Sequence, residues 1–221
     1  MTTYEIFDLS KSLAEPLLSK TEYPWEALPQ IRDFILNLIP SLDKSVYEEV
    51  KPAVWIAKSA KIAPSADITG PTIIGENTEI RPSAFIRGSA LIGNGCVIGN
   101  STEVKNAIIF DSVQIPHYNY VGDSILGYRS HLGAGAVTSN VKSDKTLVTV
   151  KVNGEKIPTG LKKFGAMVGD YVEIGCNTVL CPGTVIGRNS NVYPLSRVRG
   201  FVPENSIFKN AENIVPKKEQ N

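Results

Sequence analysis

Residues 74–104 read IGENTEIRPSAFIRGSALIGNGCVIGNSTEV, and an aliphatic side chain occupies every sixth position of this stretch. The spacing begins at Ile56, and small residues such as Ala60, Ala84 and Cys96 stand four positions after an aliphatic one. Because side chains alternate between the two faces of a strand, the aliphatic and the small residue point inward together. Three such repeats complete a triangular coil of 18 residues whose strands pair in parallel with those of the next coil. The sequence therefore predicts an all-β protein, a parallel β-helix.

The two ends of the chain fall outside this pattern. Residues 1–50 are expected to form a helical segment, with helices near residues 9–19 and 25–38, the second ended by Pro40. We expect the apolar face of the second helix to dock on the end of the coil or on a neighbouring subunit. Residues 209–221 are expected to be a frayed tail.

The repeat domain spans residues 51–208 and is altered in its second half. The spacing slips by one residue near Ile109 and again near Leu126. Residues 141–164 leave the register, and the Asn-Gly pair at 153–154 predicts a hairpin inside this inserted loop. The alterations mark the part of the coil in which we look for function.

Composition narrows the class of function. A length of 221 residues with 42% hydrophobic residues fits one domain, and a formal charge of +1 argues against a nucleic-acid or membrane-surface partner. The N-terminus lacks an apolar signal core, and no stretch is long enough to span a bilayer, so a cytoplasmic location is expected. The three cysteines include no CxxC pair, which argues against a disulfide framework or a zinc site.

Two cations are aligned by the 18-residue coil. Arg87 and Lys105 are 18 residues apart and each follows an inward aliphatic residue, so they should stack on one outer face about 5 Å apart. Aligned cations repel unless something negative lies between them, which makes the pair a candidate site for a phosphate-like anion. A solvated surface pair is the alternative. Glu103 and Tyr120 belong to the same face.

A histidine lies at the corner that leads into this face. His117 could accept a proton from an attacking amine or hydroxyl, although an ordinary surface histidine is the alternative. Glu103 would either orient His117 or bind substrate, and both roles remain open. Asn140 lies at the corner leaving the face one coil further on. Polar residues from separate segments thus converge on one patch.

Several motifs resemble a known family. The hexads IGENTE and IGNSTE resemble those of the hexapeptide-repeat acyltransferases, which implies a left-handed β-helix and a homotrimer. The runs STEVKNA, PHYNYVGDS and LGAGAVTSN resemble the acetyltransferase domain of the bifunctional glucosamine-1-phosphate acetyltransferases/N-acetylglucosamine-1-phosphate uridyltransferases. The later run LVTVKVNGEKIPTGLKKFGAMVGD and the segment YPWEAL are similar to the archaeal two-function relatives.

The resemblance implies a role for each matching residue. His117 would be the catalytic base, Glu103 would support the amino sugar and Asn140 would lie near the acetyl group. Arg87 and Lys105 would bind the sugar phosphate with Tyr120 beside them. Acetyl-CoA, the implied co-substrate, would contact Ala134, Lys145, Ala166 and Cys176. His131 stands where bacterial members have an asparagine that touches the sugar, which leaves the acceptor open.

The expected activity is acetyl-CoA-dependent N-acetylation of an amino sugar phosphate, most simply glucosamine 1-phosphate. The alternatives are another acceptor, such as a nucleotide-linked amino sugar, and a non-catalytic relative. A carbonic-anhydrase-type zinc site needs three histidines, and the chain has only His117 and His131, so no metal is expected. No glycine-rich nucleotide loop opens the chain, so uridyl transfer is not expected.

Overall fold

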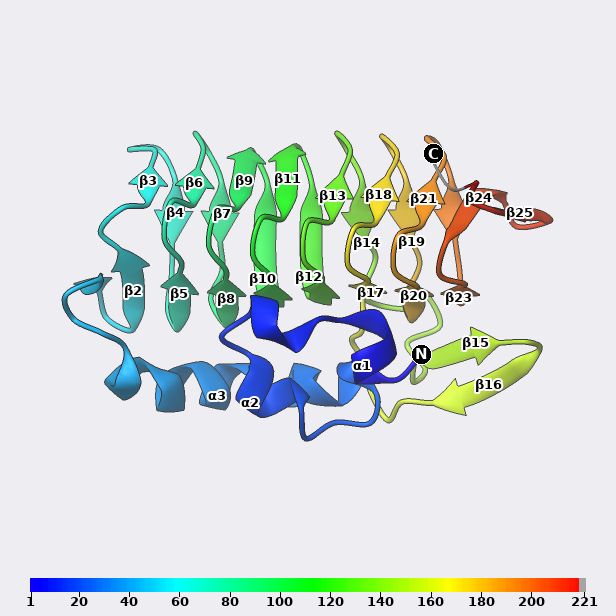
Figure 1. Cartoon of the computed structure of the whole chain (residues 1–221), viewed down its shortest axis with the longest axis horizontal. Helices are drawn as coiled ribbons and strands as arrows, with labels where there is room; N and C mark the ends of the chain where they lie inside the picture. The colour runs from blue at the N-terminus through cyan, green and yellow to red at the C-terminus, as the bar shows by residue number, and fades with distance from the viewer. Residues whose placement is uncertain (219–221) are drawn as a thin grey trace.

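The computed structural model describes residues 1–218, and the larger part of the chain is wound into a β-helix of short parallel strands joined by turns (Figure 1). One face of the triangular coil, called the site face here, is built from the following strands and from the first halves of β10 (Glu103–Ile109) and β12 (Tyr120–Leu126): β4 (Asp67–Ile68), β7 (Phe85–Ile86), β14 (Val137–Thr138), β19 (Val179–Leu180) and β22 (Arg197–Val198).

The second face, called the covered face, contains the second halves of β10 and β12 together with β2 (Val54–Ala57), β5 (Thr72–Ile74), β8 (Ala90–Ile92), β17 (Ala166–Val168), β20 (Thr184–Ile186) and β23 (Phe201–Val202). The third face contains β3 (Lys61–Ile62), β6 (Glu79–Ile80), β9 (Val97–Asn100), β11 (Gln114–His117), β13 (His131–Leu132), β18 (Glu173–Ile174), β21 (Asn191–Val192) and β24 (Ser206–Asn210).

The strand register follows the six-residue spacing. Val104 is aligned with Ile86 of the preceding coil and with Val121 of the following coil, and all three side chains are fully buried. The inward aliphatic rows therefore form one continuous core along the coil axis, as the repeat predicts.

The two slips in the spacing coincide with a tightened corner between the site face and the covered face. In the preceding coil this corner takes two residues with positive φ, Gly88 and Ser89. In β10 and β12 a single residue turns the corner, Asn106 with φ 47° and Asp123 with φ 49°. The strands run unbroken through the turn, and the coil shortens from 18 to 17 residues, as the pairing of Ile109 with Leu126 shows.

The N-terminal segment is less helical than expected. It contains α1 (Thr3–Ile6), η1 (Leu9–Lys11), α2 (Glu15–Leu18), η2 (Pro24–Gln30), α3 (Ile31–Leu38) and η3 (Ile39–Ser41). The expected helix at 9–19 is divided because the Ser12 hydroxyl accepts a hydrogen bond from the Ala14 amide and turns the backbone out of the helix. The expected helix at 25–38 begins as a 3₁₀ helix because Pro29 has no amide hydrogen to donate.

This segment docks on the flank of the coil and not on its end. Figure 1 shows the helices in a row along the covered face, and α3 contacts β8 and β10. Leu28, Ile31 and Ile35 are buried against it. The covering explains why β5, β8, β17 and β20 are buried at every position, whereas strands of the other faces alternate.

Two further expectations about the ends were wrong. Residues 47–51, partly inside the expected helical segment, form β1 (Tyr47–Lys51), which pairs antiparallel with β2. In the tail, β25 (Asn213–Pro216) pairs antiparallel with β24 and adds one strand to the third face. The last residues of the expected tail, 219–221, lie outside the described residues.

The inserted loop carries the expected hairpin, β15 (Thr149–Val152) and β16 (Glu155–Pro158), whose turn residues Asn153 and Gly154 both have positive φ. It projects beside the C-terminal half of the coil (Figure 1). Gly183 and Gly200 let it approach closely, since a Cβ atom on Gly200 would lie 2.8 Å from the carbonyl oxygen of Lys151. Within residues 1–218 no helix is long and apolar enough to cross a membrane.

Candidate active site

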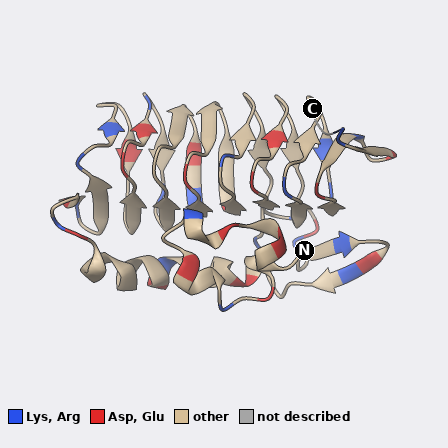
Figure 2. Cartoon of the chain, viewed as in Figure 1, with Lys and Arg blue, Asp and Glu red and all other residues tan. Residues whose placement is uncertain are grey.

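The outer surface of the site face is organised in rows. The strand pairing aligns the residues that directly follow the inward positions, one per coil, and these are Thr69, Arg87, Lys105, Gly122, Ser139, Cys181 and Arg199. The row thus carries the adjacent cations Arg87 and Lys105 near one end, Arg199 at the other end and small side chains between them. Figure 2 shows the charged residues distributed over the whole chain rather than gathered on one side.

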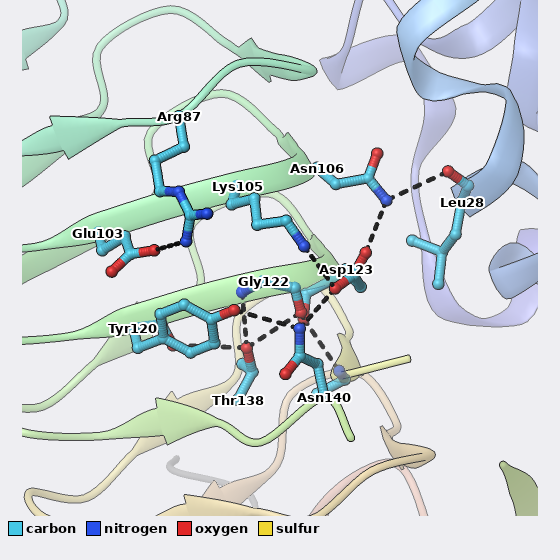
Figure 3. Close-up of polar contacts among 12 residues, drawn as sticks. Leu28, Arg87, Glu103, Lys105, Asn106, Tyr120, Gly122, Asp123, Thr138 and Asn140 are labelled. Atoms are coloured by element: carbon cyan, nitrogen blue, oxygen red, sulfur yellow. Dashed lines mark hydrogen bonds and ion pairs between the residues drawn. The ribbon is translucent and has the colours of Figure 1, made fainter. Parts of the chain in front are cut away.

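Arg87 pairs with a carboxylate of its own chain. Its Nη1 atom donates to Oε1 of Glu103 at 2.6 Å (Figure 3). Its guanidinium lies over the ring of Phe85. The hydrogen bond to Glu103 raises the pKa of Arg87. Glu103 is therefore engaged with Arg87 and not with His117, which favours a substrate-side role for Glu103 over that of orienting the histidine.

Lys105 pairs with a different carboxylate, that of Asp123. The distance from Nζ of Lys105 to Oδ2 of Asp123 is 3.4 Å, and Asp123 is almost fully buried. The repulsion between Arg87 and Lys105 is thus relieved inside the protein without a bound anion. Both cations keep unused donor hydrogens, because a guanidinium has five and an ammonium has three.

Asp123 is the centre of a polar ladder at the tightened corner. It accepts a hydrogen bond from the side chain of Asn106 at 2.9 Å and another from that of Asn140 at 2.5 Å (Figure 3). These three residues are 17 positions apart and occupy one corner in successive coils. Asn106 also donates to the carbonyl oxygen of Leu28 at 3.3 Å, which ties the ladder to the N-terminal segment.

The orientation of Asn140 follows from its neighbours. Nδ2 of Asn140 faces the carboxylate of Asp123, which can only accept, and also donates to the hydroxyl oxygen of Tyr120 at 3.1 Å. Within residues 1–218 the side-chain oxygen of Asn140 accepts no hydrogen bond.

Tyr120 lies flat across its own strand. A Cβ atom on Gly122 would come within 2.3 Å of the Tyr120 hydroxyl, so the glycine makes room for the ring. Burial and the nearby charges of Asp123 and Glu103 raise the pKa of Tyr120. The hydroxyl group therefore stays neutral at physiological pH.

His117 ends β11 at the opposite corner of the site face and is exposed. No hydrogen bond to its imidazole is made within residues 1–218, so both ring nitrogens are accessible. Its carbonyl oxygen accepts from the Gly135 amide, and the Ala134 carbonyl oxygen accepts from the Asn177 amide. His117, Ala134 and Cys176 therefore follow one another along one corner of successive coils.

The remaining expected residues lie elsewhere. Ala166 is buried at the start of β17, where its amide donates to the Ser124 hydroxyl at 3.0 Å. Lys145 is exposed in the inserted loop. His131 is on the third face, where its Nδ1 lies 2.8 Å from Oε2 of Glu173, away from the cations of the site face.

Asp123 and Asn106 were not among the residues expected from the sequence. The signal that could have found them is the pair of slips, because a corner one residue shorter brings these side chains into contact. No group of three or more metal-ligating side chains gathers in the part of the chain that the structure describes.

Comparison with known proteins agrees with this architecture. The family model described as the GMPPB C-terminal domain matches residues 68–202. A bifunctional sugar-1-phosphate nucleotidylyltransferase/acetyltransferase of Sulfurisphaera tokodaii is 38% identical over 109 residues, which cover 49% of this chain and 27% of that protein. The bifunctional protein GlmU of Methanococcus maripaludis is 32% identical over 199 residues, which cover 89% of this chain and 48% of that protein.

A third relative matches along its whole length. The putative uncharacterized acetyltransferase YaiX of Escherichia coli is 32% identical, with 94% of this chain and 98% of that protein covered. The chain thus spans less than half the length of the two bifunctional relatives and almost all of YaiX.

The coil, its register and these matches define a left-handed β-helix of the hexapeptide-repeat class. Within that class the chain belongs to the family of the GMPPB C-terminal domain, whose model covers more than half of its residues.

Proposed function

We propose that this protein is an acetyl-CoA-dependent N-acetyltransferase that acts on an amino sugar phosphate, most simply glucosamine 1-phosphate. The observation that carries the proposal is the convergence of His117, the Arg87–Glu103 pair and the Asp123 ladder on one face of the coil. The names of the Sulfurisphaera tokodaii relative and of YaiX both include acetyltransferase, which supports transfer of an acetyl group.

The residues proposed to take part in the reaction lie at the two corners of the site face, with His117 at one corner and Asn140 and Asp123 at the other. The amine of the sugar attacks the thioester carbon, His117 takes the proton from the amine nitrogen, and the thiolate of coenzyme A leaves. Backbone amides would stabilise the oxyanion of the tetrahedral intermediate. Asn140 would lie near the acetyl group, and Asp123 would fix the orientation of its side chain.

The cations would hold the phosphate of the acceptor. Arg87 and Lys105 each retain donor hydrogens after pairing with Glu103 and Asp123, and a phosphate can accept several hydrogen bonds from both. Tyr120, as a neutral hydroxyl, would complete this end of the site. Ala134 and Cys176 continue the corner of His117 and would line the path of acetyl-CoA, with Ala166 and Lys145 contributing nearer the inserted loop.

One observation favours a second acceptor class. Both cations are already neutralised by carboxylates, so a monoester phosphate is not required to relieve their repulsion. At the position where bacterial members have an asparagine, His131 presents an imidazole that is paired with Glu173, so no side-chain amide is available to the sugar there. These features support an amino sugar linked to a nucleotide as the alternative acceptor.

A single assay separates the two acceptors. Purified protein is mixed with acetyl-CoA and either glucosamine 1-phosphate or a nucleotide-linked amino sugar, and thiol release and the N-acetylated product are both measured. Turnover of glucosamine 1-phosphate that falls in Arg87→Gln supports the first acceptor. Turnover of the nucleotide-linked sugar alone supports the second, and no release of thiol with either contradicts the proposal.

The proposal includes a homotrimer, the assembly implied by the family resemblance. Light scattering on the purified protein tests it, and a monomer at assay concentrations would contradict it.

A further inference from the structure

The N-terminal segment reaches the polar ladder at the tightened corner from the covered face. The side-chain amino group of Asn106 donates to the carbonyl oxygen of Leu28 at 3.3 Å and to Oδ1 of Asp123 at 2.9 Å (Figure 3). Leu28 lies in η2, and Asn106 turns the corner within β10. Because an amino group carries two hydrogens, it can make both bonds at once. Asn106 therefore bridges η2 to the carboxylate of Asp123.

A second, apolar route leads from the same element to the same corner. The buried ring of Trp25, also in η2, lies 5.7 Å from that of the fully buried Phe164. The Phe164 amide donates to the carbonyl oxygen of Asn140 at 2.9 Å. The amide of the next residue, Gly165, donates to the carbonyl oxygen of Asp123 at 2.8 Å. Trp25 is thus packed against the segment whose backbone holds both Asp123 and Asn140.

The two routes end on groups that belong to the proposed site. Oδ2 of Asp123 lies 3.4 Å from Nζ of Lys105 and 2.5 Å from Nδ2 of Asn140. Asp123 is only 5% exposed, so its position is set by contacts within the protein and not by solvent. A displacement of η2, or the loss of the Asn106 side chain, would therefore disturb Asp123 and, through it, both Lys105 and Asn140.

We propose that η2 is a positioning element for the acceptor end of the site and that Asn106 is the positioning residue through which it acts. The inference rests on the proposed function, because Lys105 and Asn140 have their roles in that reaction. The covering segment thus does more than bury the apolar side chains of the covered face. It fixes the carboxylate that orients a phosphate-binding cation and the side chain beside the acetyl group.

Two variants of Asn106 and one control test this role. Asn106→Gly removes the side chain and keeps the corner, because glycine adopts positive φ readily. Asn106→Asp keeps the shape but turns the donor into an oxygen that faces the acceptors of Leu28 and Asp123. Asn189→Gly is the matched control, since Asn189 has φ 55° and its side chain donates to that of Asn205 at 2.8 Å, at a corner between the covered face and the third face.

Two measurements are made on the full chain. Amide hydrogen exchange, followed by mass spectrometry on peptides that contain Phe164 and Gly165, reports the bonds to Asn140 and Asp123 and needs no substrate. Thiol release gives kcat/KM for whichever acceptor the unmodified protein uses, and also the KM for acetyl-CoA. Circular dichroism verifies that each variant keeps its β-structure.

We expect Asn106→Gly to speed the exchange of the two amides about tenfold and to lower kcat/KM for the acceptor by a similar factor, the effect of losing one hydrogen bond to a charged group. Asn106→Asp should lower kcat/KM further. The KM for acetyl-CoA should not change, because its expected contacts Ala134 and Cys176 lie at the corner of His117. Asn189→Gly should change neither the exchange nor the kinetics.

Three results would overturn the inference. The first is exchange of Phe164 and Gly165 that is as slow in Asn106→Gly as in Asn189→Gly, whether or not an amino sugar is acetylated. The second is faster exchange with unchanged acceptor kinetics, because Asn106 would then brace the corner without acting on the site. The third is normal kinetics in Asn106→Asp, which would show that the shape of the side chain is sufficient.

Failure of the proposed function has a different signature. If Asn106→Gly speeds the exchange of the two amides but the unmodified protein acetylates no acceptor, the proposed reaction fails and the coupling of η2 to the ladder stands.

Discussion

Replacing Asp123 with asparagine tests whether the ladder at the tightened corner organises the site. The side chain keeps its shape but loses its charge, and one oxygen becomes an NH₂ group, which faces Nδ2 of Asn106 if it replaces Oδ1 and faces both Asn140 and Lys105 if it replaces Oδ2. In either case two donors meet, and a cation that is 23% exposed loses its carboxylate.

The magnitude follows from these contacts. A hydrogen bond to a charged group contributes about 1.5–3 kcal/mol. Lys105 and Asn140 both contact Oδ2 of Asp123, so both contacts weaken when the carboxylate becomes an amide. Because Lys105 is partly exposed, solvent screening reduces its share. We expect Asp123→Asn to lower the free energy of unfolding by about 2 kcal/mol and to raise the KM for the acceptor, since both Asn140 and Lys105 are released.

Urea denaturation followed by circular dichroism measures the stability, and the thiol-release assay measures the KM. The matched control is Asp67→Asn, which removes the carboxylate of an exposed Lys51–Asp67 pair at 3.6 Å and should cost less than about 1 kcal/mol. If Asp123→Asn and Asp67→Asn have equal unfolding free energies and unchanged KM values, the ladder does not organise the site.

Three further predictions concern other parts of the molecule. Gly122→Ala should displace the ring of Tyr120, because the added Cβ would lie 2.3 Å from its hydroxyl, and acetyl transfer should fall; transfer equal to that of the unmodified protein would contradict this. In the native protein a thiol reagent should modify the exposed Cys176 and spare Cys96, because burial raises the pKa of the Cys96 thiol to about 12. If acetyl-CoA binds next to Cys176, it should slow the modification of that thiol. Equal rates of modification for the two thiols would contradict this prediction. Burial raises the pKa of Asp170, so its contribution to stability is present below the ordinary pKa of aspartate, about 3.9, and is lost as the pH rises through the raised value. Urea unfolding of the protein and of Asp170→Asn should therefore show a difference that shifts against the unmodified protein as the pH rises above the ordinary aspartate pKa, and a constant difference would refute this.

The sequence predicts the coil because every repeat has the same six-residue spacing. That spacing places aliphatic residues such as Val104 in the interior of the coil, and it also aligns Arg87 with Lys105 on the outer surface. The family resemblance added the left-handed sense, which spacing does not contain.

The parts that were mispredicted depend on contacts between distant segments. The pairing of β1 with β2 and the docking of α3 on the covered face depend on tertiary contacts, which the helix and strand propensities of the local sequence do not determine. The carboxylate partner of Lys105 was missed for the same reason, since Asp123 reaches it only because the corner is one residue shorter.

His117 is proposed to take the proton from an amine that attacks acetyl-CoA on the site face. The most direct measurement of this role compares kcat/KM for acetyl transfer to glucosamine 1-phosphate in the unmodified protein and in His117→Ala. We expect transfer by the unmodified protein and a loss of about 10²–10⁴-fold in the variant, the contribution of a positioned general base. Equal rates in the two proteins would contradict it.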